Sequence, residues 1–391
     1  MMKNLTISLF VSFLVVSLSF AGNFIPSSGI PVENQYIVVL KEEGETPSAK
    51  AREALLKNLA TQHGAQLART YDAVLNGGVM QMTEARAKAL AHNPFVDYVE
   101  QDSVVQLVVP ADASQQTPTP SWGLDRIDQR YLPLNSAYSY ANDGAGVTVY
   151  VIDTGIYLDH NDFGGRASSG IDIVNDGNGG DCHGHGTHVA GTIGGAAYGV
   201  AKQVSLLSVR VLNCNGSGSM SGVIAGVDWV TANIDAPAVA NMSLGGGKSR
   251  SLDTAVSNSI KRGVAYVVAA GNSGRDACNY SPSGVSSAIT VGATSSTDSR
   301  PSWSNYGSCL DLFAPGVSIT SSWIGVPTSV ATISGTSMAA PHVAGAAALM
   351  LGDSPYYSPG DISSKLIEKS TKSVVKNAGS KSPNRLLFTD F

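Results

Sequence analysis

The segment Ile333-Ser-Gly-Thr-Ser-Met-Ala-Ala-Pro-His-Val-Ala-Gly345 sets a serine between a predicted strand and a predicted helix. Residues 330–333 are Val-Ala-Thr-Ile, whose β-branched content favours a short strand. Residues 344–351 form an Ala/Leu/Met run typical of a buried helix. Ser337 would then lie at a helix N-terminus, where free backbone N–H groups stabilise developing negative charge, so it is a candidate nucleophile. A Gly/Ser turn with a helix cap is the alternative.

Two neighbours of Ser337 fit this placement. Gly335 lets the chain turn tightly before the helix. Pro341 is expected early enough in the helix that its missing N–H costs little. The segment therefore predicts a strand, a tight turn and a helix in immediate succession.

From Trp122 onward the chain is rich in glycine and alternates apolar runs with helical stretches. The apolar runs are nearly continuous, as in parallel strands covered on both faces, and their alternation with helices predicts a doubly wound, mostly parallel α/β domain. In such a domain the functional site lies at the carboxyl ends of the strands. The predicted strands are 147–152, 205–211, 239–243, 264–270 and 289–291, and the predicted helices are 187–193, 222–233 and 252–262.

The first part of the chain predicts a small, separate α+β domain. Ser48 and Thr83 are candidate N-caps of its two helices, and Gly64 ends the first helix. The element order βαββαβ is the split β-α-β unit of a ferredoxin-like sandwich. Residues 110–120, rich in Pro, Ser, Thr and Gln, predict an exposed linker of the kind that proteases cut. The predicted strands are 35–40, 66–71, 78–82 and 96–100, and the predicted helices are 49–63 and 84–91.

Composition and the N-terminus indicate an exported globular protein. The chain has 391 residues, 43% hydrophobic and 14% charged, which is enough for two or three domains with a substantial core. Its net charge of −5 argues against nucleic-acid binding. Lys3, an apolar run at 5–18 and small residues up to Ala21 predict a secretory signal peptide, cut after Ala21. A membrane anchor is the alternative, but the run is short for a span and no later run reaches transmembrane length, so we expect no membrane association after export.

Export makes the four cysteines candidates for disulfides. Four cysteines allow three pairings, and we favour the two sequential pairs, Cys182–Cys214 and Cys278–Cys309. A zinc site is the alternative, although no Cys-x-x-Cys spacing supports it.

Three more polar residues lie at the ends of predicted elements. Asp153 ends the strand Val-Tyr-Val-Ile-Asp, His185 opens a helix, and Asn272 follows a strand that ends in Ala-Ala-Gly. Taken alone, each residue is more often structural: the aspartate would cap a helix or turn, the histidine would stabilise the fold, and the asparagine would belong to a turn. Together with Ser337 they predict an acyl-transfer site, in which Asp orients His, His takes the serine proton and Asn receives the oxyanion. The chain order Asp, His, Ser is that of subtilisin.

Three motifs resemble signatures of the subtilase family of serine proteases: Asp153-Thr-Gly, His185-Gly-Thr-His-Val-Ala-Gly and Gly335-Thr-Ser-Met-Ala-Ala-Pro-His. Within that family the chain is most similar to the proteinase K branch, and especially to aqualysin-like extracellular serine proteases, through residues 122–130, 241–247 and 382–387. The four cysteines also match the two-disulfide pattern of this branch. The resemblance covers residues 122–387, and residues 35–102 resemble the family's inhibitory propeptide.

The resemblance implies a serine endopeptidase made as a zymogen. Its implied catalytic residues are Asp153 as orienting carboxylate, His185 as general base and acid, Ser337 as nucleophile and Asn272 as oxyanion donor. Residues 215–218 and 243–245 resemble the two segments that pair with substrate backbone. Residues 269–271 resemble the wall of the first pocket, which is apolar and open, and this implies broad cleavage after apolar or aromatic residues. The residues implied to bind substrate are Gly216, Ser217, Gly218, Ser243, Leu244, Gly245, Ala270 and Gly271.

The resemblance also implies structural calcium, which prefers hard oxygen ligands. One site maps onto the carbonyls of Ser286 and Ala288 and the carboxylate of Asp311. A further site maps onto Asp125, Asp128 and Gln129. The alternative for both sites is a solvated loop aspartate.

With the signal peptide at residues 1–21, the resemblance divides the rest of the chain into three parts. Residues 22–109 would be a propeptide that acts as inhibitor and folding chaperone, residues 110–120 a linker with the maturation cleavage region, and residues 121–391 a subtilisin-like peptidase domain. The partners of the protease would be protein and peptide substrates and its own propeptide. The propeptide would be an intramolecular inhibitor, and its tail, residues 104–109, would occupy the active-site cleft as a cleavage product does. Self-cleavage would release this domain, and we expect a secreted extracellular monomer.

Two other functions are weighed against this one. The first is a catalytically inactive subtilase fold that serves as a binding protein. The second is a zinc metallopeptidase built on His183, His185 and His188 beside Cys182. The sequence has neither His-Glu-x-x-His nor a nearby third acidic ligand, which argues against zinc catalysis.

Overall fold

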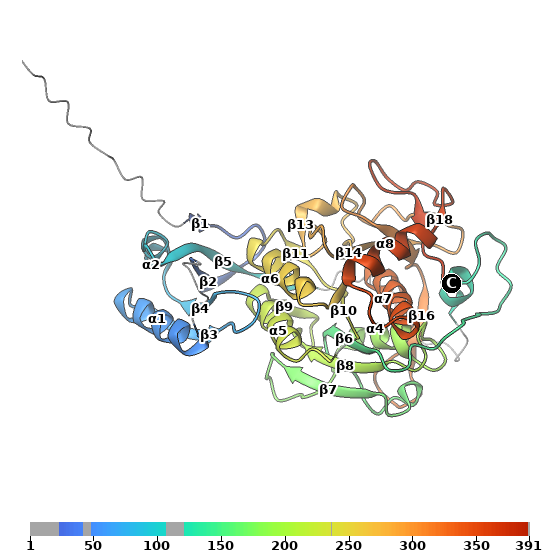
Figure 1. The fold of residues 1–391 in the computed structure, drawn as a ribbon, viewed down its shortest axis with the longest axis horizontal. Helices are drawn as coiled ribbons and strands as arrows, with labels where there is room; N and C mark the ends of the chain where they lie inside the picture. The colour runs from blue at the N-terminus through green and yellow to red at the C-terminus, as the bar shows by residue number, and fades with distance from the viewer. Residues whose placement is uncertain (1–22, 42–47, 107–120, 236, 390–391) are drawn as a thin grey trace, which may run out of the picture.

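The computed structural model describes residues 23–41, 48–106, 121–235 and 237–389, which form two units side by side (Figure 1). The N-terminal unit runs to residue 106, and the C-terminal unit begins at residue 121. The predicted signal peptide and the predicted linker lie outside the described residues. Among the helices that are described, none combines the length and the apolar character needed to span a bilayer.

The N-terminal unit is a sheet with two helices packed on one face. The four predicted strands pair in the ferredoxin-like order β5-β2-β4-β3, and an unpredicted strand, β1, pairs with the outer edge of β5. β1 spans only three residues, too few to show a period in the sequence. The elements are β1 (Asn23–Ile25), β2 (Pro31–Leu40), α1 (Ala49–Gln62), β3 (Gln66–Thr70), β4 (Gly77–Gln81), α2 (Glu84–Leu90) and β5 (Val96–Gln106).

The two helices of this unit start as predicted, but only one start is capped by a side chain. Ser48 precedes α1, and its hydroxyl accepts a hydrogen bond from the backbone N–H of Ala51 (3.3 Å). Thr83 occupies the corresponding position before α2, yet its hydroxyl makes no capping bond, so the prediction of a Thr83 cap was wrong. Gly64 follows α1 with a φ of +60°, a backbone conformation that suits glycine at a helix end.

The C-terminal unit contains every strand and helix predicted for it, with ends shifted by a few residues. Its helices are α3 (Trp122–Ile127), α4 (His185–Gly194), α5 (Met220–Ala232), α6 (Arg250–Lys261), α7 (Thr336–Asp353) and α8 (Pro359–Lys369). Its strands are β6 (Thr148–Asp153), β7 (Ala167–Asp172), β8 (Ser205–Arg210), β9 (Ser217–Ser219), β10 (Ala238–Met242), β11 (Gly246–Gly247), β12 (Ala265–Ala269), β13 (Tyr280–Ser281), β14 (Ile289–Thr294), β15 (Leu312–Pro315), β16 (Ile319–Ser322), β17 (Val330–Ile333), β18 (Thr371–Lys372) and β19 (Arg385–Leu386).

The main sheet has the order β18-β19-β15-β14-β12-β10-β6-β8-β7, and every pair in it is parallel except β18 with β19. The predicted doubly wound, mostly parallel α/β fold is therefore confirmed. After β6, the chain forms β7 and β8 on one side of β6, and then β10 and the later strands on its other side. The strand order thus reverses between β6 and β10.

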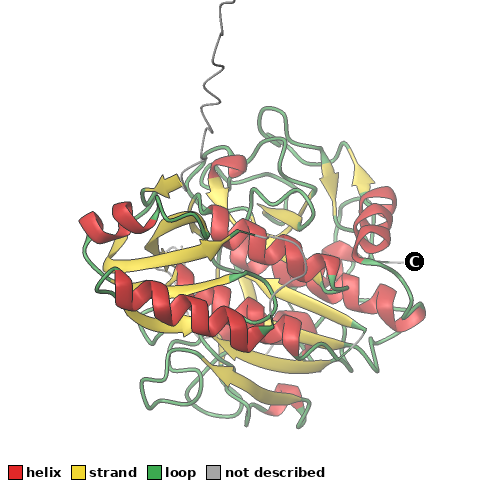
Figure 2. Cartoon of the chain, turned by 60° about the vertical axis from the view of Figure 1, so that its left-hand side comes forward, coloured by secondary structure: helices red, strands yellow, loops and turns green. Residues whose placement is uncertain are grey.

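Helices cover both faces of this sheet (Figure 2). Alternate residues of a strand point to opposite faces. In β6, Val149 and Val151 join the core around α4 and α7, whereas Tyr150 and Ile152 join the core around α5 and α6. Because both faces are buried, the strands have the nearly continuous apolar sequence from which they were predicted.

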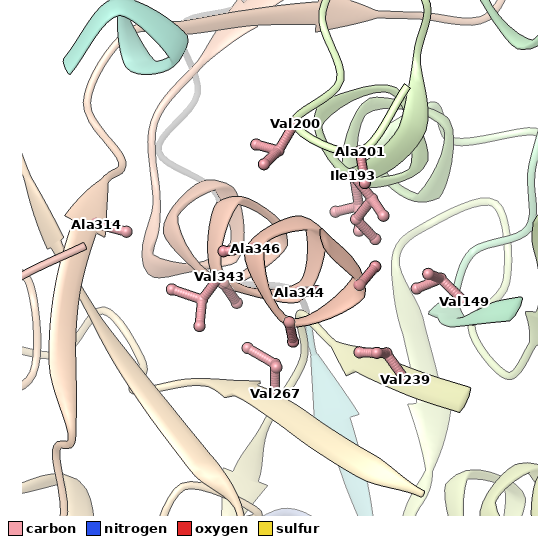
Figure 3. Close-up of a cluster of buried hydrophobic side chains, with 14 of the residues drawn as sticks. Val149, Ile193, Val200, Ala201, Val239, Val267, Ala314, Val343, Ala344 and Ala346 are labelled. Carbon is pink, nitrogen blue, oxygen red and sulfur yellow. The ribbon is translucent and has the colours of Figure 1, made fainter. Parts of the chain in front are cut away.

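Helix α7 runs through the middle of the larger core (Figure 3). All of its residues from 336 to 351 are buried, and Val343, Ala344 and Ala346 lie among side chains of the sheet such as Val239 and Val267. Its small residues allow the sheet and α4 to approach closely. This packing fixes the position of the helix N-terminus.

Pro341 is the sixth residue of α7, beyond the first turn, so the prediction that it lies near the helix start was wrong. A proline there cannot donate to the carbonyl of Ser337, four residues earlier. The hydroxyl of Ser243 donates to that carbonyl instead (2.8 Å). A side chain that follows β10 therefore offsets the missing helical hydrogen bond.

The two units pack through the second face of the N-terminal sheet, which lies against α5 and α6 (Figure 1). Ile37 and Val39 of β2 share one apolar cluster with Val223 of α5 and Val256 of α6. The N-terminal sheet thus buries both faces, one on its own helices and one on the C-terminal unit.

Candidate active site

Asp153 and His185 form a hydrogen-bonded pair in the interior. Asp153 ends β6, His185 begins α4, and neither side chain has exposed surface. Nδ1 of His185 lies 2.8 Å from Oδ1 of Asp153, which also accepts from the backbone N–H of Thr154 (2.7 Å). Because Nδ1–H donates to the carboxylate, the nitrogen that can accept a proton is Nε2. Nε2 is buried and has no hydrogen-bond partner in the described part of the chain.

Ser337 is the second residue of α7, with 4% of its surface exposed. Its hydroxyl donates to the backbone carbonyl of Ser243 (3.0 Å). The hydrogen bond predicted between Ser337 and Nε2 of His185 is therefore not made in this structure. In return, the hydroxyl of Ser243 donates to the carbonyl of Ser337, so two hydrogen bonds hold α7 to the end of β10.

The strand ends bring Ser337 beside the Asp153–His185 pair. β10 and β6 are parallel neighbours, with Asn241 opposite Val151. Two residues further along each strand come Ser243 and Asp153, which therefore lie level at the carboxyl edge of the sheet. The strand order reverses between these two strands, and α/β sheets bind their ligands at such a reversal.

Asn272, three residues after β12, contacts the residue that precedes Ser337. Its Oδ1 accepts from the backbone N–H (2.9 Å) and the hydroxyl (2.7 Å) of Thr336, which fixes the orientation of the amide. A Cβ placed on Gly335 would lie 3.3 Å from Nδ2 of Asn272 and 3.5 Å from the backbone nitrogen of Ser337. Both nitrogens thus border one small space, an arrangement suited to binding an oxyanion.

A cavity of about 220 Å³ adjoins Ser337 and Asn272. Four of the predicted substrate residues line it, namely Leu244, Gly245, Ala270 and Gly271. Most of its lining is glycine, alanine and other small or apolar residues, so the cavity suits an apolar side chain. Gly29 and Ile30 of the N-terminal unit and Asn305 of the C-terminal unit also line it, and the sequence predicted none of these three.

Three more of the predicted substrate residues lie along β9, and the last one, Ser243, follows β10. Ser217 and Gly218 belong to this strand, and Gly216 precedes it with a φ of +68°. β9 pairs antiparallel with the end of β5, where Gln106 lies opposite Ser217. The end of β5 thus adds a strand to an open edge, as a peptide does in β-augmentation. The predicted inhibitory tail, residues 104–109, is described as far as residue 106.

Asp181 joins the segment of His185 to the strand of Asp153. Its Oδ1 accepts from the hydroxyl of Thr154 (2.9 Å) and from the backbone N–H groups of His183 (3.0 Å) and Gly184 (2.8 Å). Its Oδ2 accepts from the N–H (2.9 Å) and hydroxyl (2.6 Å) of Thr187 in α4. The sequence motifs did not mark this residue as functional, although an aspartate just before a helix is a recognised start signal.

Two buried carboxylates of β5 sit at helix N-termini of the C-terminal unit. Glu100 accepts from the hydroxyl of Ser249 (2.6 Å) and the N–H of Ser251 (2.9 Å) at the start of α6. Asp102 accepts from the N–H of Ser221 (3.0 Å) at the start of α5. Free N–H groups and the helix dipole stabilise negative charge at such positions. The two carboxylates therefore hold the units together in one orientation.

The two disulfides join Cys182 to Cys214 and Cys278 to Cys309, which is the predicted pairing. The first bridge links the loop before α4 to the loop before β9. It thereby connects the segment that carries His185 to the edge that pairs with β5.

The histidines do not gather into a metal site. Within the described residues, no group of three or more His, Cys, Asp or Glu side chains is arranged to hold a metal ion. Nε2 of His188 lies 2.9 Å from the carbonyl of Ile319, and burial lowers the pKa of this imidazole to about 3. His183 and His185 have ring centres 6.3 Å apart. The hydrogen bond to Ile319 and the burial of His188 give it a structural role.

The residues of the first predicted calcium site lie at the start of two neighbouring strands. Ser286 and Ala288 precede β14, Asp311 precedes β15, and these two strands pair in parallel. Oδ2 of Asp311 accepts from the N–H of Thr290 (2.8 Å), and burial raises the pKa of this carboxyl to about 6. A buried carboxylate with a raised pKa would be stabilised by a hard cation, so Asp311 fits the role of a calcium ligand.

The residues of the second predicted calcium site are partly engaged elsewhere. Both carboxylate oxygens of Asp125 accept from backbone N–H groups, those of Asn135 (3.1 Å) and Ser136 (2.7 Å). The side-chain amide of Gln129 donates to the carbonyl of Pro133 (2.8 Å). Oδ1 of Asp128 is buried and has no partner among the described residues. Of the two aspartates, Asp128 therefore has the carboxylate oxygen that a cation could satisfy.

Residues 144–386 match the Subtilase family, and residues 35–108 match Peptidase inhibitor I9. The chain is 54% identical over 376 residues to the extracellular serine proteinase of Thermus sp. (strain Rt41A), a match that covers 92% of this chain and 90% of that protein. It is 49% identical over 369 residues to alkaline serine exoprotease A of Vibrio alginolyticus, covering 92% and 68% of the two chains.

A crystal structure of a cold adapted subtilisin-like serine proteinase shares the fold, with a TM-score of 0.67 and 56% identity. The match covers 68% of this chain and 97% of that one. The Subtilase match extends over most of the C-terminal unit, and the inhibitor match over most of the N-terminal unit. The chain belongs to the subtilase family, as a serine-type endopeptidase that carries a peptidase inhibitor I9 domain ahead of its protease domain.

Proposed function

We propose that this protease hydrolyses peptide bonds through an acyl-enzyme formed on Ser337. His185 takes the proton of the attacking hydroxyl and later returns it to the leaving amine, while Asp153 holds the imidazole in the required tautomer. Asn272 and the backbone N–H of Ser337 stabilise the oxyanion. The observation that carries this proposal is the buried hydrogen bond from Nδ1 of His185 to Asp153, which leaves Nε2 as a base without a partner.

In the proposed reaction, the hydrogen-bond acceptor of the Ser337 hydroxyl changes. The hydroxyl of Ser337 must leave the carbonyl of Ser243 and turn toward Nε2 of His185. Serine side chains exchange among staggered rotamers at low cost, and catalytic hydrogen bonds are often formed only in the substrate complex. The bond to Ser243 thus holds the hydroxyl at the site until the substrate arrives.

Phenylmethylsulfonyl fluoride tests this mechanism directly. We expect the reagent to abolish casein hydrolysis and to add one sulfonyl group, located on Ser337 by peptide mass spectrometry. A protein boiled before treatment serves as the control for labelling that needs no folded site. Undiminished hydrolysis after treatment would remove the serine mechanism and leave the metal-dependent alternative.

We propose broad cleavage after apolar or aromatic residues. The apolar cavity beside Ser337 supports this preference, and the pairing of β5 with β9 supports substrate binding as an added strand. Ser243, Leu244 and Gly245 would pair with the other side of the substrate backbone. A peptide library that is cleaved mainly after charged residues would contradict the proposed preference.

The I9 domain is proposed to act as an intramolecular inhibitor until the chain cuts itself. The proposed division is a signal peptide at 1–21, a propeptide at 22–109, a cleavage region at 110–120 and a peptidase domain at 121–391. The extracellular and exoprotease relatives support secretion of the mature enzyme, which we propose to be a monomer. Mass spectrometry of the secreted protein, with its N-terminus and native mass, tests each of these boundaries.

Removal of the charge on Glu100 and Asp102 is expected to weaken this inhibition. Each carboxylate accepts charge-assisted hydrogen bonds from a helix start, worth about 1.5–3 kcal/mol. Glu100→Gln and Asp102→Asn should each weaken inhibition by the cleaved propeptide about ten- to a hundredfold. The lag before peptide hydrolysis begins, measured after cleavage of the full chain, reports this change.

Asp97→Asn is the matched control, because Asp97 contacts Arg250 across the same interface as an exposed ion pair. Exposed pairs contribute little, so its lag should equal that of the unsubstituted chain. Equal lags for all three variants would contradict the proposed role of the two buried carboxylates.

We propose that structural calcium binds Asp311 and the carbonyls of Ser286 and Ala288, where it would supply positive charge to a buried carboxylate. The pKa of Asp311, about 6 in the calcium-free protein, lies above its ordinary value of 3.8. Without calcium, this carboxyl therefore destabilises the folded state progressively as the pH rises from 3.8 to about 6, and the full effect is present above that pH. At the second site, Asp128 would be the principal ligand.

Removal of calcium is accordingly expected to lower the Tm more at pH 8 than at pH 5. Asp311→Asn should remove this difference, because its side chain carries no charge at either pH. Asp159→Asn, at an exposed position, is the control and should keep it. Scanning calorimetry of protein depleted of calcium at pH 8 and transferred to each buffer, with and without added calcium chloride, measures the effect, and an equal loss of Tm at both pH values would refute the assignment.

A further inference from the structure

Asn305 is a buried asparagine that neither the sequence motifs nor the catalytic scheme uses. Only 1% of its surface is exposed, and its side chain borders the cavity beside Ser337. A buried amide must satisfy its donors and acceptor inside the protein. All of the hydrogen bonds recorded for the Asn305 side chain go to one turn, residues 270–275.

This turn carries the cavity wall and the proposed oxyanion donor. Ala270 and Gly271 form part of the wall, and Asn272 follows them directly. The backbone of the turn bonds outward: the N–H of Gly274 donates to the carbonyl of Trp303 (2.7 Å), and the carbonyl of Gly271 accepts from the N–H of Asn305 (2.9 Å). The position of the turn therefore depends on the segment that contains Asn305.

The Asn305 side chain holds the turn on both sides of Asn272. Its Nδ2 donates to the carbonyl of Ala270 (2.8 Å), two residues before Asn272. Its Oδ1 accepts from the N–H groups of Ser273 (3.1 Å) and Arg275 (2.9 Å), which follow Asn272. One amide thus satisfies an acceptor and two donors of the same turn, which an aliphatic side chain could not do.

The contact between this amide and the wall leaves no spare room. Gly271 has a φ of +97°, and a Cβ added to it would lie 2.5 Å from Nδ2 of Asn305. The wall can approach Asn305 only because residue 271 has no side chain. The width of the cavity at this point is therefore set by the position of the Asn305 amide.

We propose that Asn305 is a positioning residue that sets the pocket wall, and thereby determines which side chain is accepted next to the cleaved bond. This inference rests on the proposed function, in which the cavity receives that side chain. Through the same turn Asn305 also places Nδ2 of Asn272 beside Ser337. Loss of the amide would let the wall shift, so that large and small side chains are discriminated less well.

The test uses Asn305→Ala and Asn305→Asp in the full chain, matured under the same conditions as the unsubstituted protease. The aspartate keeps the shape and both acceptor bonds, but it replaces the donor to the carbonyl of Ala270 by an acceptor. Two peptides that differ only in having Phe or Ala before the cleaved bond are hydrolysed. The readout is the ratio of their kcat/KM values, which does not depend on the fraction of active enzyme.

Both variants are expected to lower the Phe-to-Ala ratio by about tenfold, the lower end of what a pocket gains from one methylene group. Asn384→Ala is the matched control, because the Asn384 amide braces both the N–H and the carbonyl of Val375 (2.9 and 2.8 Å) outside the cavity. It should lose some stability and keep the ratio.

An unchanged ratio in both Asn305 variants overturns the proposal, whatever their total activity. Failure of both to mature, while Asn384→Ala matures, also overturns it, since Asn305 would then be needed for folding rather than for selection. Failure of the serine mechanism itself is seen separately, as hydrolysis that survives phenylmethylsulfonyl fluoride.

Discussion

The Ser337→Ala chain is expected to hydrolyse no peptide and to keep its N-terminal domain covalently attached. The hydroxyl is the only proposed nucleophile, so kcat should fall by on the order of 10⁶, the loss found for the equivalent serine of subtilisin, a member of the same family. Cleavage between the domains should stop as well, because it would use the same site. Gel electrophoresis of the secreted product and hydrolysis of a chromogenic peptide measure the two effects.

Ser358→Ala is the matched control for this experiment. Ser358 is also a serine at a helix N-terminus, and its hydroxyl caps α8 far along the chain from the site. Its loss should cost about 0.5–2 kcal/mol of stability and leave activity intact. A Ser337→Ala protein that is cut to its mature length in the absence of other proteases would refute self-cleavage, even if it were inactive on peptides.

Asn272→Ala is expected to lower kcat by about 10²–10³ with little change in KM, a range established on subtilisin itself. The amide contributes only when negative charge develops on the substrate oxygen, so ground-state binding should be nearly unaffected. The change also leaves the two Thr336 donors without their acceptor, at a cost of about 1–3 kcal/mol of stability. Kinetics should therefore be measured well below the Tm.

Asn233→Ala is a suitable comparison, since this asparagine ends α5 with an exposed amide that bonds only its own helix. Its kcat should match that of the unsubstituted enzyme. A fall in kcat of less than about tenfold for Asn272→Ala would show that the backbone N–H of Ser337 alone stabilises the oxyanion.

Much of this fold could be predicted because both faces of the main sheet are buried. Burial on two sides leaves long apolar runs such as 239–243 and 264–270, and these runs marked the strands. The strands of the N-terminal domain were also recognised, because each is long enough to show its pattern. β1 was missed, since three residues carry no period and its pairing with β5 depends on contacts distant in sequence.

The residues of the site differ in how well sequence could identify them. Asp153, His185 and Ser337 each stand at the junction of a strand and a turn or helix, and three short motifs mark them. Asp181 and Asn305 act through hydrogen bonds to backbone groups and, for Asp181, also to the hydroxyls of Thr154 and Thr187. A single polar residue in a loop gives no such signal, because its partners are defined only once the chain has folded.

The hydroxyl direction of Ser337 shows a different limit. Motifs predict which side chains come together, but they do not predict that the Ser337 hydroxyl donates to the carbonyl of Ser243. Likewise the position of Pro341 was judged from the expected helix start, which the structure places earlier. Element boundaries and rotamers depend on local packing energies too small to leave a pattern in sequence.

Neither cystine crosses from one domain to the other, because all four cysteines lie beyond residue 181. After one peptide bond between the domains is broken, only noncovalent contacts hold them together. An association that was intramolecular then becomes bimolecular and follows mass action. Dilution into the surrounding medium would by itself favour departure of the inhibitor, with neither a reductant nor a second protease required for the separation.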